Sequence, residues 1–130
     1  MTVGLSAVNY ANAALNVLSG TTFTASANTY VKLHTGDPGS AGASNASANT
    51  TRVILAWSAA SAGSKAITAT LPQWATWAAG SETISHVSIW DALTNGNFLM
   101  SIALTASKAV TNGDTLNLTS LSVSFTPIAA

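Results

Sequence analysis

The chain has 130 residues, of which 48% are apolar, and this length predicts a single domain over 1–130 with one core. Only 6% of the residues are charged, against roughly 25% in average soluble proteins, and the net charge is zero. This balance excludes an electrostatic basis for binding nucleic acid or an anionic membrane, and the absence of cysteine excludes disulfides and thiolate metal sites.

The first predicted element is a helix over 6–19, within an N-terminal segment that spans 1–20. Ser6 can cap its start, and Gly20 can adopt the left-handed conformation just past its end. Because asparagine is a mediocre helix former, we expect packing of the apolar face to hold the helix in place; that face carries Val8, Ala11, Leu15 and Leu18. The opposite face is amide-rich and is either a partner-contact surface or a plain solvated one: Asn9, Asn12 and Asn16.

A strand is predicted over 29–34, and it ends at the turn sequence GDPG over 36–39. The next segment, 40–51, consists of small and polar residues with almost nothing to bury. We therefore predict a long exposed loop over 40–51 that is mobile unless a neighbour orders it. Its polar side chains are candidate partner contacts: Ser44, Asn45, Ser47 and Asn49.

The chain has four tryptophans, and the sequence predicts two different environments for them. Trp57 lies on a predicted strand over 52–58, and Trp90 lies on a predicted hairpin strand, so both are assigned to the core. Trp74 and Trp77 fall in an irregular connection over 72–81 and are the candidates for an exposed aromatic platform. For this pair, packing against the sheet or a neighbouring subunit is favoured over binding of sugars.

The remaining sequence predicts antiparallel strands. A strand is predicted over 65–71, and the segments 83–90 and 97–104 form a hairpin around Asn95 and Gly96, which adopt positive φ at little cost. The last apolar run, 116–125, changes phase near Ser120, so a kink or bulge is expected there. The predicted fold is mainly β: a single antiparallel β-sandwich of about six to eight short strands with one N-terminal α-helix.

The sequence offers few groups for chemistry. Asp37, Asp91 and Asp114 each lie in a turn sequence, where an aspartate usually caps its own backbone, and Glu82 has no partner nearby in sequence. The two histidines, His34 and His86, are interpreted as structural, and no metal-ligand spacing joins them to the acids. A calcium site of turn carboxylates and carbonyls stays an open alternative, although the EF-hand pattern is missing. We predict no enzyme activity, no cofactor and no metal.

Two segments carry a family resemblance: YVKLHTGDPGSAG over 30–42 and ISHVSIWDALTNGNFLM over 84–100. With TTRVILAWSAA and NGDTLNLTSLSVSFT, they make nearly the whole chain resemble small virion proteins of tailed bacteriophages, which are described as tail-fibre-like or head-decoration proteins. The resemblance implies a virion structural protein on the outer surface of the particle, made in the bacterial host cytoplasm. It implies no catalytic residues.

The place in the virion is open between two alternatives. The short chain shows no internal repeats, which favours a capsid decoration protein bound to the major capsid protein on the outside of the assembled head. The main alternative is a tail-fibre or other tail-surface protein that contacts tail proteins and takes part in host attachment. A carbohydrate-binding module is the third. The low charge favours a chain that stays assembled, and the resemblance implies a homo-oligomer, with a trimer favoured.

Overall fold

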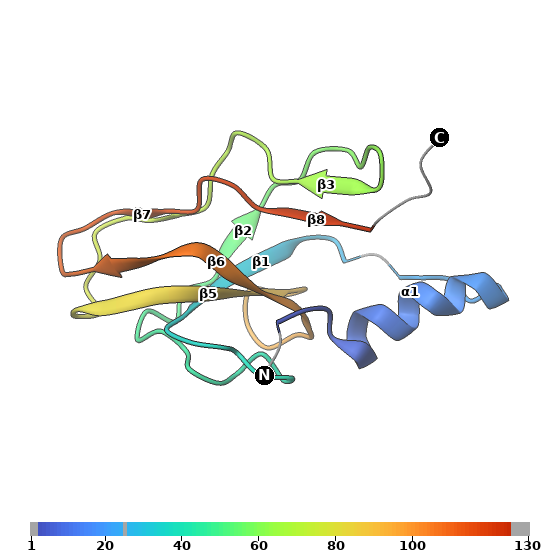
Figure 1. Cartoon of the computed structure of the whole chain (residues 1–130), viewed down its shortest axis with the longest axis horizontal. Helices are drawn as coiled ribbons and strands as arrows, with labels where there is room; N and C mark the ends of the chain where they lie inside the picture. The colour runs from blue at the N-terminus through green and yellow to red at the C-terminus, as the bar shows by residue number, and fades with distance from the viewer. Residues whose placement is uncertain (1–2, 25, 126–130) are drawn as a thin grey trace.

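The computed structural model describes residues 3–24 and 26–125, and in this part of the chain a main antiparallel sheet has the strand order β2-β1-β5-β6. Two further pairs, β3-β8 and β4-β7, form two-stranded ribbons that lie on one side of the main sheet (Figure 1). The prediction of a mainly β, antiparallel fold with one N-terminal helix is confirmed. The strands are β1 Thr29–His34, β2 Val53–Leu55, β3 Ser64–Ala66, β4 Gln73–Trp74, β5 Glu82–Trp90, β6 Phe98–Val110, β7 Leu116–Asn117 and β8 Ser122–Ser124.

The hairpin of β5 and β6 forms one side of the main sheet, with β6 at the edge, and its turn is built as the sequence predicts. Asn95 and Gly96 have φ values of 55° and 73°. Asp91 closes the turn, because its carboxylate accepts hydrogen bonds from the backbone N–H of Asn97 at 2.7 Å and from its side-chain amide at 2.8 Å. Strand β6 continues to Val110, beyond the predicted end, and pairs with the start of β5 across a register shift between Ile84 and His86.

The core lies between the main sheet and the two ribbons. Alternate residues of β1 and β5 point into it, and both tryptophans of the connection over 72–81 join them. The fully or almost fully buried members include Val31, Leu33, Trp74, Trp77, Ile84, Val87 and Ile89. The predicted break near Ser120 is also present, because the last run of the chain pairs first with β4 and then with β3.

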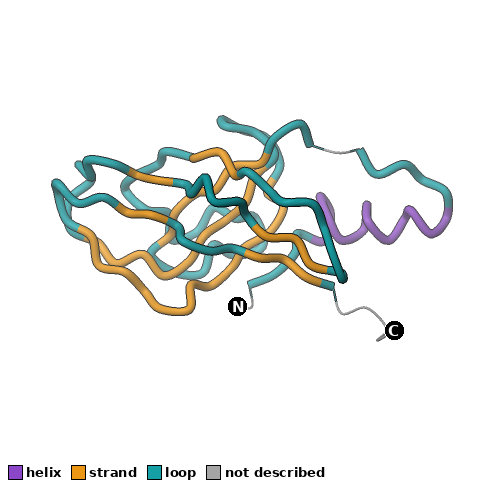
Figure 2. Tube along the Cα trace, turned by 90° about the horizontal axis from the view of Figure 1, so that it is seen from above, coloured by secondary structure: helices purple, strands orange, loops and turns teal. Residues whose placement is uncertain are grey.

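The N-terminal helical segment, 7–19, projects from one end of this body (Figures 1 and 2). It begins as a π-helix over Ala7–Ala11, continues as the α-helix α1 over Asn12–Asn16, and ends as a 3-10 helix over Val17–Ser19. The predicted caps are confirmed: the Oγ of Ser6 accepts from the N–H of Asn9 at 3.3 Å, and Gly20 has a φ of 82°.

The predicted packing of this helix is wrong. None of its residues is buried, and the expected apolar face is open, with exposed fractions of 78% for Val8, 63% for Leu15 and 88% for Leu18. The side that is partly covered instead carries Asn9 and Tyr10. The reason is the anchor at the start of the segment, where backbone hydrogen bonds to β6 direct the helix away from the sheet.

Candidate binding surface

The acidic residues act as structural hydrogen-bond acceptors and do not converge on one site. Asp37 accepts from the N–H of Gly39 at 2.8 Å, and Asp114 accepts from the N–H of Thr111 at 2.9 Å, so both have the predicted turn-capping role. Within 3–24 and 26–125, no group of three or more His, Asp and Glu side chains is arranged to hold a metal ion. The acids are thus engaged in holding turns and loops.

Glu82 orders the loop over 40–51. The sequence predicted that this loop would be mobile unless a neighbouring chain ordered it. The Glu82 carboxylate accepts from the hydroxyl of Ser47, which is 2% exposed, and from the N–H of Ala48 at 3.2 Å. Backbone hydrogen bonds fasten Ser47 to Leu33 and Thr35 to Asn45. The expectation that this loop needs a neighbour for its order is therefore corrected: contacts within the chain hold it, although most of its surface stays exposed.

A buried histidine connects the same loop to the main sheet. The Nδ1 of His34 lies 2.8 Å from the carbonyl oxygen of Ser44, so Nδ1 carries the proton and donates it to that carbonyl. Nε2 then accepts from the hydroxyl of Ser88 at 2.7 Å, while the Ser88 oxygen accepts from the indole N–H of Trp90 at 2.8 Å. Burial lowers the pKa of His34 below its ordinary value, against the opposing effect of the Ser44 carbonyl. His34 is thus a neutral structural residue.

Arg52 holds the hairpin turn. Its guanidinium donates to the carbonyl oxygens of Ala92 at 2.7 Å and of Asn95 at 2.6 Å, and it lies 4.0 Å from the ring centre of Trp90. Trp90 is only partly buried, and so is Trp57, whose indole donates to the Thr29 hydroxyl at 2.7 Å.

Trp74 and Trp77 pack in the core against the sheet, which is one of the two favoured alternatives, and they form no exposed platform. Trp74 is 3% exposed and Trp77 is 1% exposed, and their indole N–H groups donate to the carbonyls of Thr51 and Gly80, both at 2.9 Å. The connection over 72–81 folds inward because Trp74 lies on β4, whose pairing with β7 turns its side chain to the core. These two side chains have no surface on which to bind a sugar or a partner.

The remaining candidate contacts divide into engaged and exposed residues. The side-chain amide of Asn9 donates to the carbonyl of Phe98 at 2.9 Å, and that of Asn45 donates to the carbonyl of Asp37, also at 2.9 Å. Asn49 accepts from the N–H of Thr51 at 3.1 Å and is half-buried. Four candidates are exposed, and the fold does not bring them into one patch: Asn12 and Asn16 on the helical segment and Ser44 and Asn45 on the loop.

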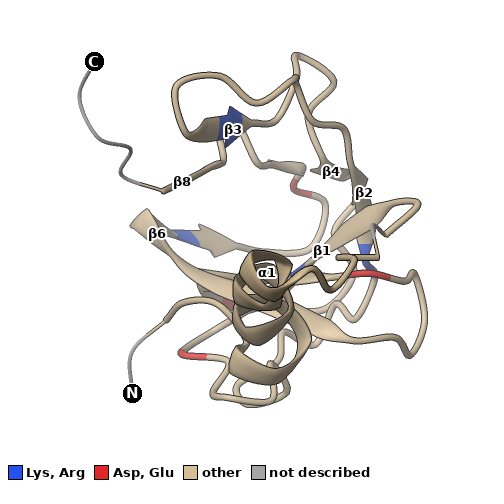
Figure 3. Cartoon of the chain, turned by 90° about the vertical axis from the view of Figure 1, so that its right-hand side faces the viewer, with Lys and Arg blue, Asp and Glu red and all other residues tan. Residues whose placement is uncertain are grey.

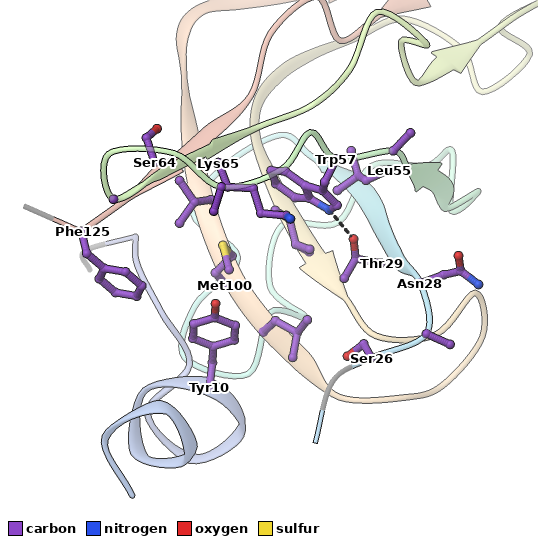
Figure 4. Close-up of a pocket in the computed structure, with 17 residues that line it drawn as sticks. Tyr10, Ser26, Asn28, Thr29, Leu55, Trp57, Ser64, Lys65, Met100 and Phe125 are labelled. Carbon is purple, nitrogen blue, oxygen red and sulfur yellow. Dashed lines mark hydrogen bonds between the residues drawn. The ribbon is translucent and has the colours of Figure 1, made fainter. Parts of the chain in front are cut away.

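The surface also has a groove beside the helical segment, which the sequence did not indicate. The groove has a volume of about 700 Å³ and runs between the main sheet and the β3-β8 ribbon (Figure 4). Its lining is mainly apolar and includes Tyr10, Leu55, Trp57, Met100, Val123 and Phe125. Among the described residues that line it, only Lys65 carries a charge. Residues from six separate parts of the chain contribute, and no local sequence pattern joins them.

An apolar groove and an uncharged projecting helix thus lie at the same end of the molecule. Figure 3 views this end, and the ribbon of α1 is tan because none of its residues is acidic or basic. The first charged residue of the chain is Lys32, in β1. Within the described residues, no helix is long and apolar enough to cross a membrane. This end of the molecule therefore combines exposed apolar side chains of the helix with a mainly apolar groove.

The comparison with known protein families assigns the chain to one of them. The family described as "Podophage GP4 fiber I protein gp80" matches residues 4–126. The chain belongs to this family of phage fibre proteins, and the predicted resemblance to phage virion proteins is confirmed at that level. Among curated proteins, none matches the chain.

Proposed function

We propose that this protein is a non-enzymatic component of a tail fibre or of the tail surface of a podophage-like virion. The observation that carries the proposal is the match of residues 4–126 to a podophage fibre family. This match favours the tail-fibre alternative over the head-decoration interpretation, which the short, repeat-free sequence had favoured. The buried state of Trp74 and Trp77 removes the basis for a carbohydrate-binding module.

The protein's partners in this proposal are other tail proteins of the same phage and further copies of itself, with a trimer favoured. A charge-poor surface, with four basic and four acidic residues in the chain, supports lasting protein contacts more than a free monomeric life. Its outward position on the virion gives it a role in host attachment.

The proposal is tested by the place of the protein on the particle. Virions are dissociated mildly into heads and tails, and an antibody against the chain identifies the fraction that retains it. We expect it on tails, and labelled antibody should decorate the tail in electron micrographs. Retention on heads that lack tails would overturn the proposal and restore the decoration interpretation.

A second measurement addresses the nature of the contact. Because few charged groups are available, attachment to the tail should stay nearly constant as sodium chloride rises from low to molar concentration. Steep loss of the protein with salt would contradict contacts that are mainly apolar and amide-based. Excess purified protein should also reduce phage adsorption if the chain contacts the host, and unchanged adsorption would remove that part of the proposal.

A further inference from the structure

The N-terminal helical segment lacks the packing that a short helix needs. Helices of this length are marginal in water, and in proteins their stability comes mostly from the burial of an apolar face. Here that face is open, because Val8, Leu15 and Leu18 are each more than three-fifths exposed. The segment therefore presents an apolar surface whose burial would stabilise it, at roughly 25 cal/mol per Å² covered.

The segment cannot fill the groove of its own chain. The N–H of Ser6 donates to the carbonyl of Leu99 at 2.7 Å, and the carbonyl of Gly4 accepts from the N–H of Ser101 at 2.8 Å. The side-chain amide of Asn9 adds a third tie to β6. These bonds fix the direction in which the helix leaves the body, and of its side chains Tyr10 reaches the groove.

The mainly apolar lining of the groove determines which kind of segment can bind in it. An apolar lining with one charged residue offers no partner for an acidic or basic peptide, whose buried charges would stay uncompensated. An uncharged helix with leucine and valine on one side and amides on the other suits it, because the apolar side can enter the groove while the amides stay in water. The chain itself supplies such a helix at 7–19.

We propose that the helical segment of one copy docks in the groove of a neighbouring copy, and that this contact builds the homo-oligomer. The inference rests on the homo-oligomer of the proposed function. Each copy then contributes one helix and one groove, so the contact joins different surfaces of two neighbours. Such contacts close into a ring when every groove is filled, and a ring of three copies satisfies all helices and all grooves.

The first test compares a double substitution in the helix with a single control substitution, both in the full chain. Leu15→Gln with Leu18→Gln removes apolar surface from the helix and keeps a residue of similar helix propensity. Light scattering at micromolar concentration should show the wild type as a multiple of the 13.1 kDa chain and this variant as a single chain. The control, Leu93→Gln, alters a side chain that is 54% exposed outside the helix and should leave the oligomer unchanged.

The second test detects the contact itself and uses the absence of cysteine. A chain with Leu18→Cys is mixed with a differently tagged chain with Ala60→Cys, which places a thiol on the groove lining. Mild oxidation should link the two tags in one product. The matched control pairs Leu18→Cys with Thr115→Cys, next to β7, and should give no such product.

Several outcomes would overturn the inference. They are a wild type that stays a monomer, an oligomer that Leu15→Gln with Leu18→Gln leaves intact, and a cross-link between the two tags that forms no more readily with Ala60→Cys than with Thr115→Cys. None of them affects the fibre assignment, which depends on where the protein is found on virions.

Discussion

The β5-β6 hairpin and the N-terminal helical segment differ in whether the chain itself covers their apolar side chains. In the hairpin, the turn is closed by Asp91 and Arg52, and Ile84 and Ile89 are completely covered. In the helical segment, the ends are capped but the apolar side chains face solvent. The hairpin is thus stabilised by the chain's own contacts, whereas the helix has its caps but lacks a packing surface. This difference separates side chains that stabilise the fold from apolar side chains that remain exposed.

The largest difference in unfolding free energy is expected between a truncation in the core and a truncation in the helical segment. Trp77→Ala should cost about 3–5 kcal/mol of unfolding free energy, because it empties a buried site and removes the hydrogen bond to Gly80. Leu18→Ala should stay within about 0.5 kcal/mol under dilute, monomeric conditions. Urea unfolding measures both, and equal losses would show that the helix packs against its own chain.

Gly20 ends the helical segment, and Gly96 lies in the hairpin turn. Both have positive φ, so alanine at Gly20 should cost about 1 kcal/mol. A Cβ at Gly96 would also lie 2.4 Å from a carboxylate oxygen of Asp91 and 2.6 Å from Ala92, and Gly96→Ala should cost about 1–3 kcal/mol more. Thermal unfolding of the two variants ranks them, and a larger loss at Gly20 would be incompatible with this structure.

Contacts within the chain hold the loop over 40–51, as they hold the hairpin, and Glu82 makes two of these contacts. Glu82→Ala should cost about 1.5–3 kcal/mol, because it removes a charged acceptor from Ser47 and Ala48. Hydrogen exchange at Ala48 and Asn49 should accelerate. Glu82→Gln, which retains one acceptor oxygen, should fall between this variant and the wild type. Unchanged exchange in Glu82→Ala would mean that the loop is held by something else.

The smallest effect concerns pH and His34. Burial depresses the pKa of His34 in the folded state, so below about pH 6.5 the unfolded chain takes up a proton that the folded chain does not. The contribution of His34 is constant above that value. Stability should fall as the pH drops below it, by at most about 1.4 kcal/mol per pH unit. His34→Gln should reduce this slope between pH 6.5 and pH 5 in urea titrations, and an identical slope would exclude His34 as its source.

Local patterns predicted much of the fold because the determining contacts are close in sequence. The alternation in β1, the Asn95-Gly96 turn, the aspartate-capped turns and the helix caps at Ser6 and Gly20 each depend on neighbours within a few residues. The phase change near Ser120 also marks a real exchange of strand partners.

The candidate surface was harder to predict because it depends on distant residues. Trp74 occupies an irregular connection in the sequence, and only its pairing with Leu116 on β7 turns it inward. Ser47 was predicted to be a partner contact, but its hydroxyl donates a hydrogen bond to Glu82, thirty-five positions away. The apolar face of the helix was correctly recognised as apolar, but periodicity alone does not state whether the covering surface belongs to the same chain.

Hydrogen exchange as a function of protein concentration tests most directly whether the helical segment depends on assembly. In the wild-type chain, amides of β5 and β6 should stay protected at every concentration, because their partners lie within the chain. Amides over 12–19 should be protected at high concentration and exchange much faster on dilution below the oligomer's dissociation range. Protection of 12–19 that is unchanged down to the monomer would contradict the account.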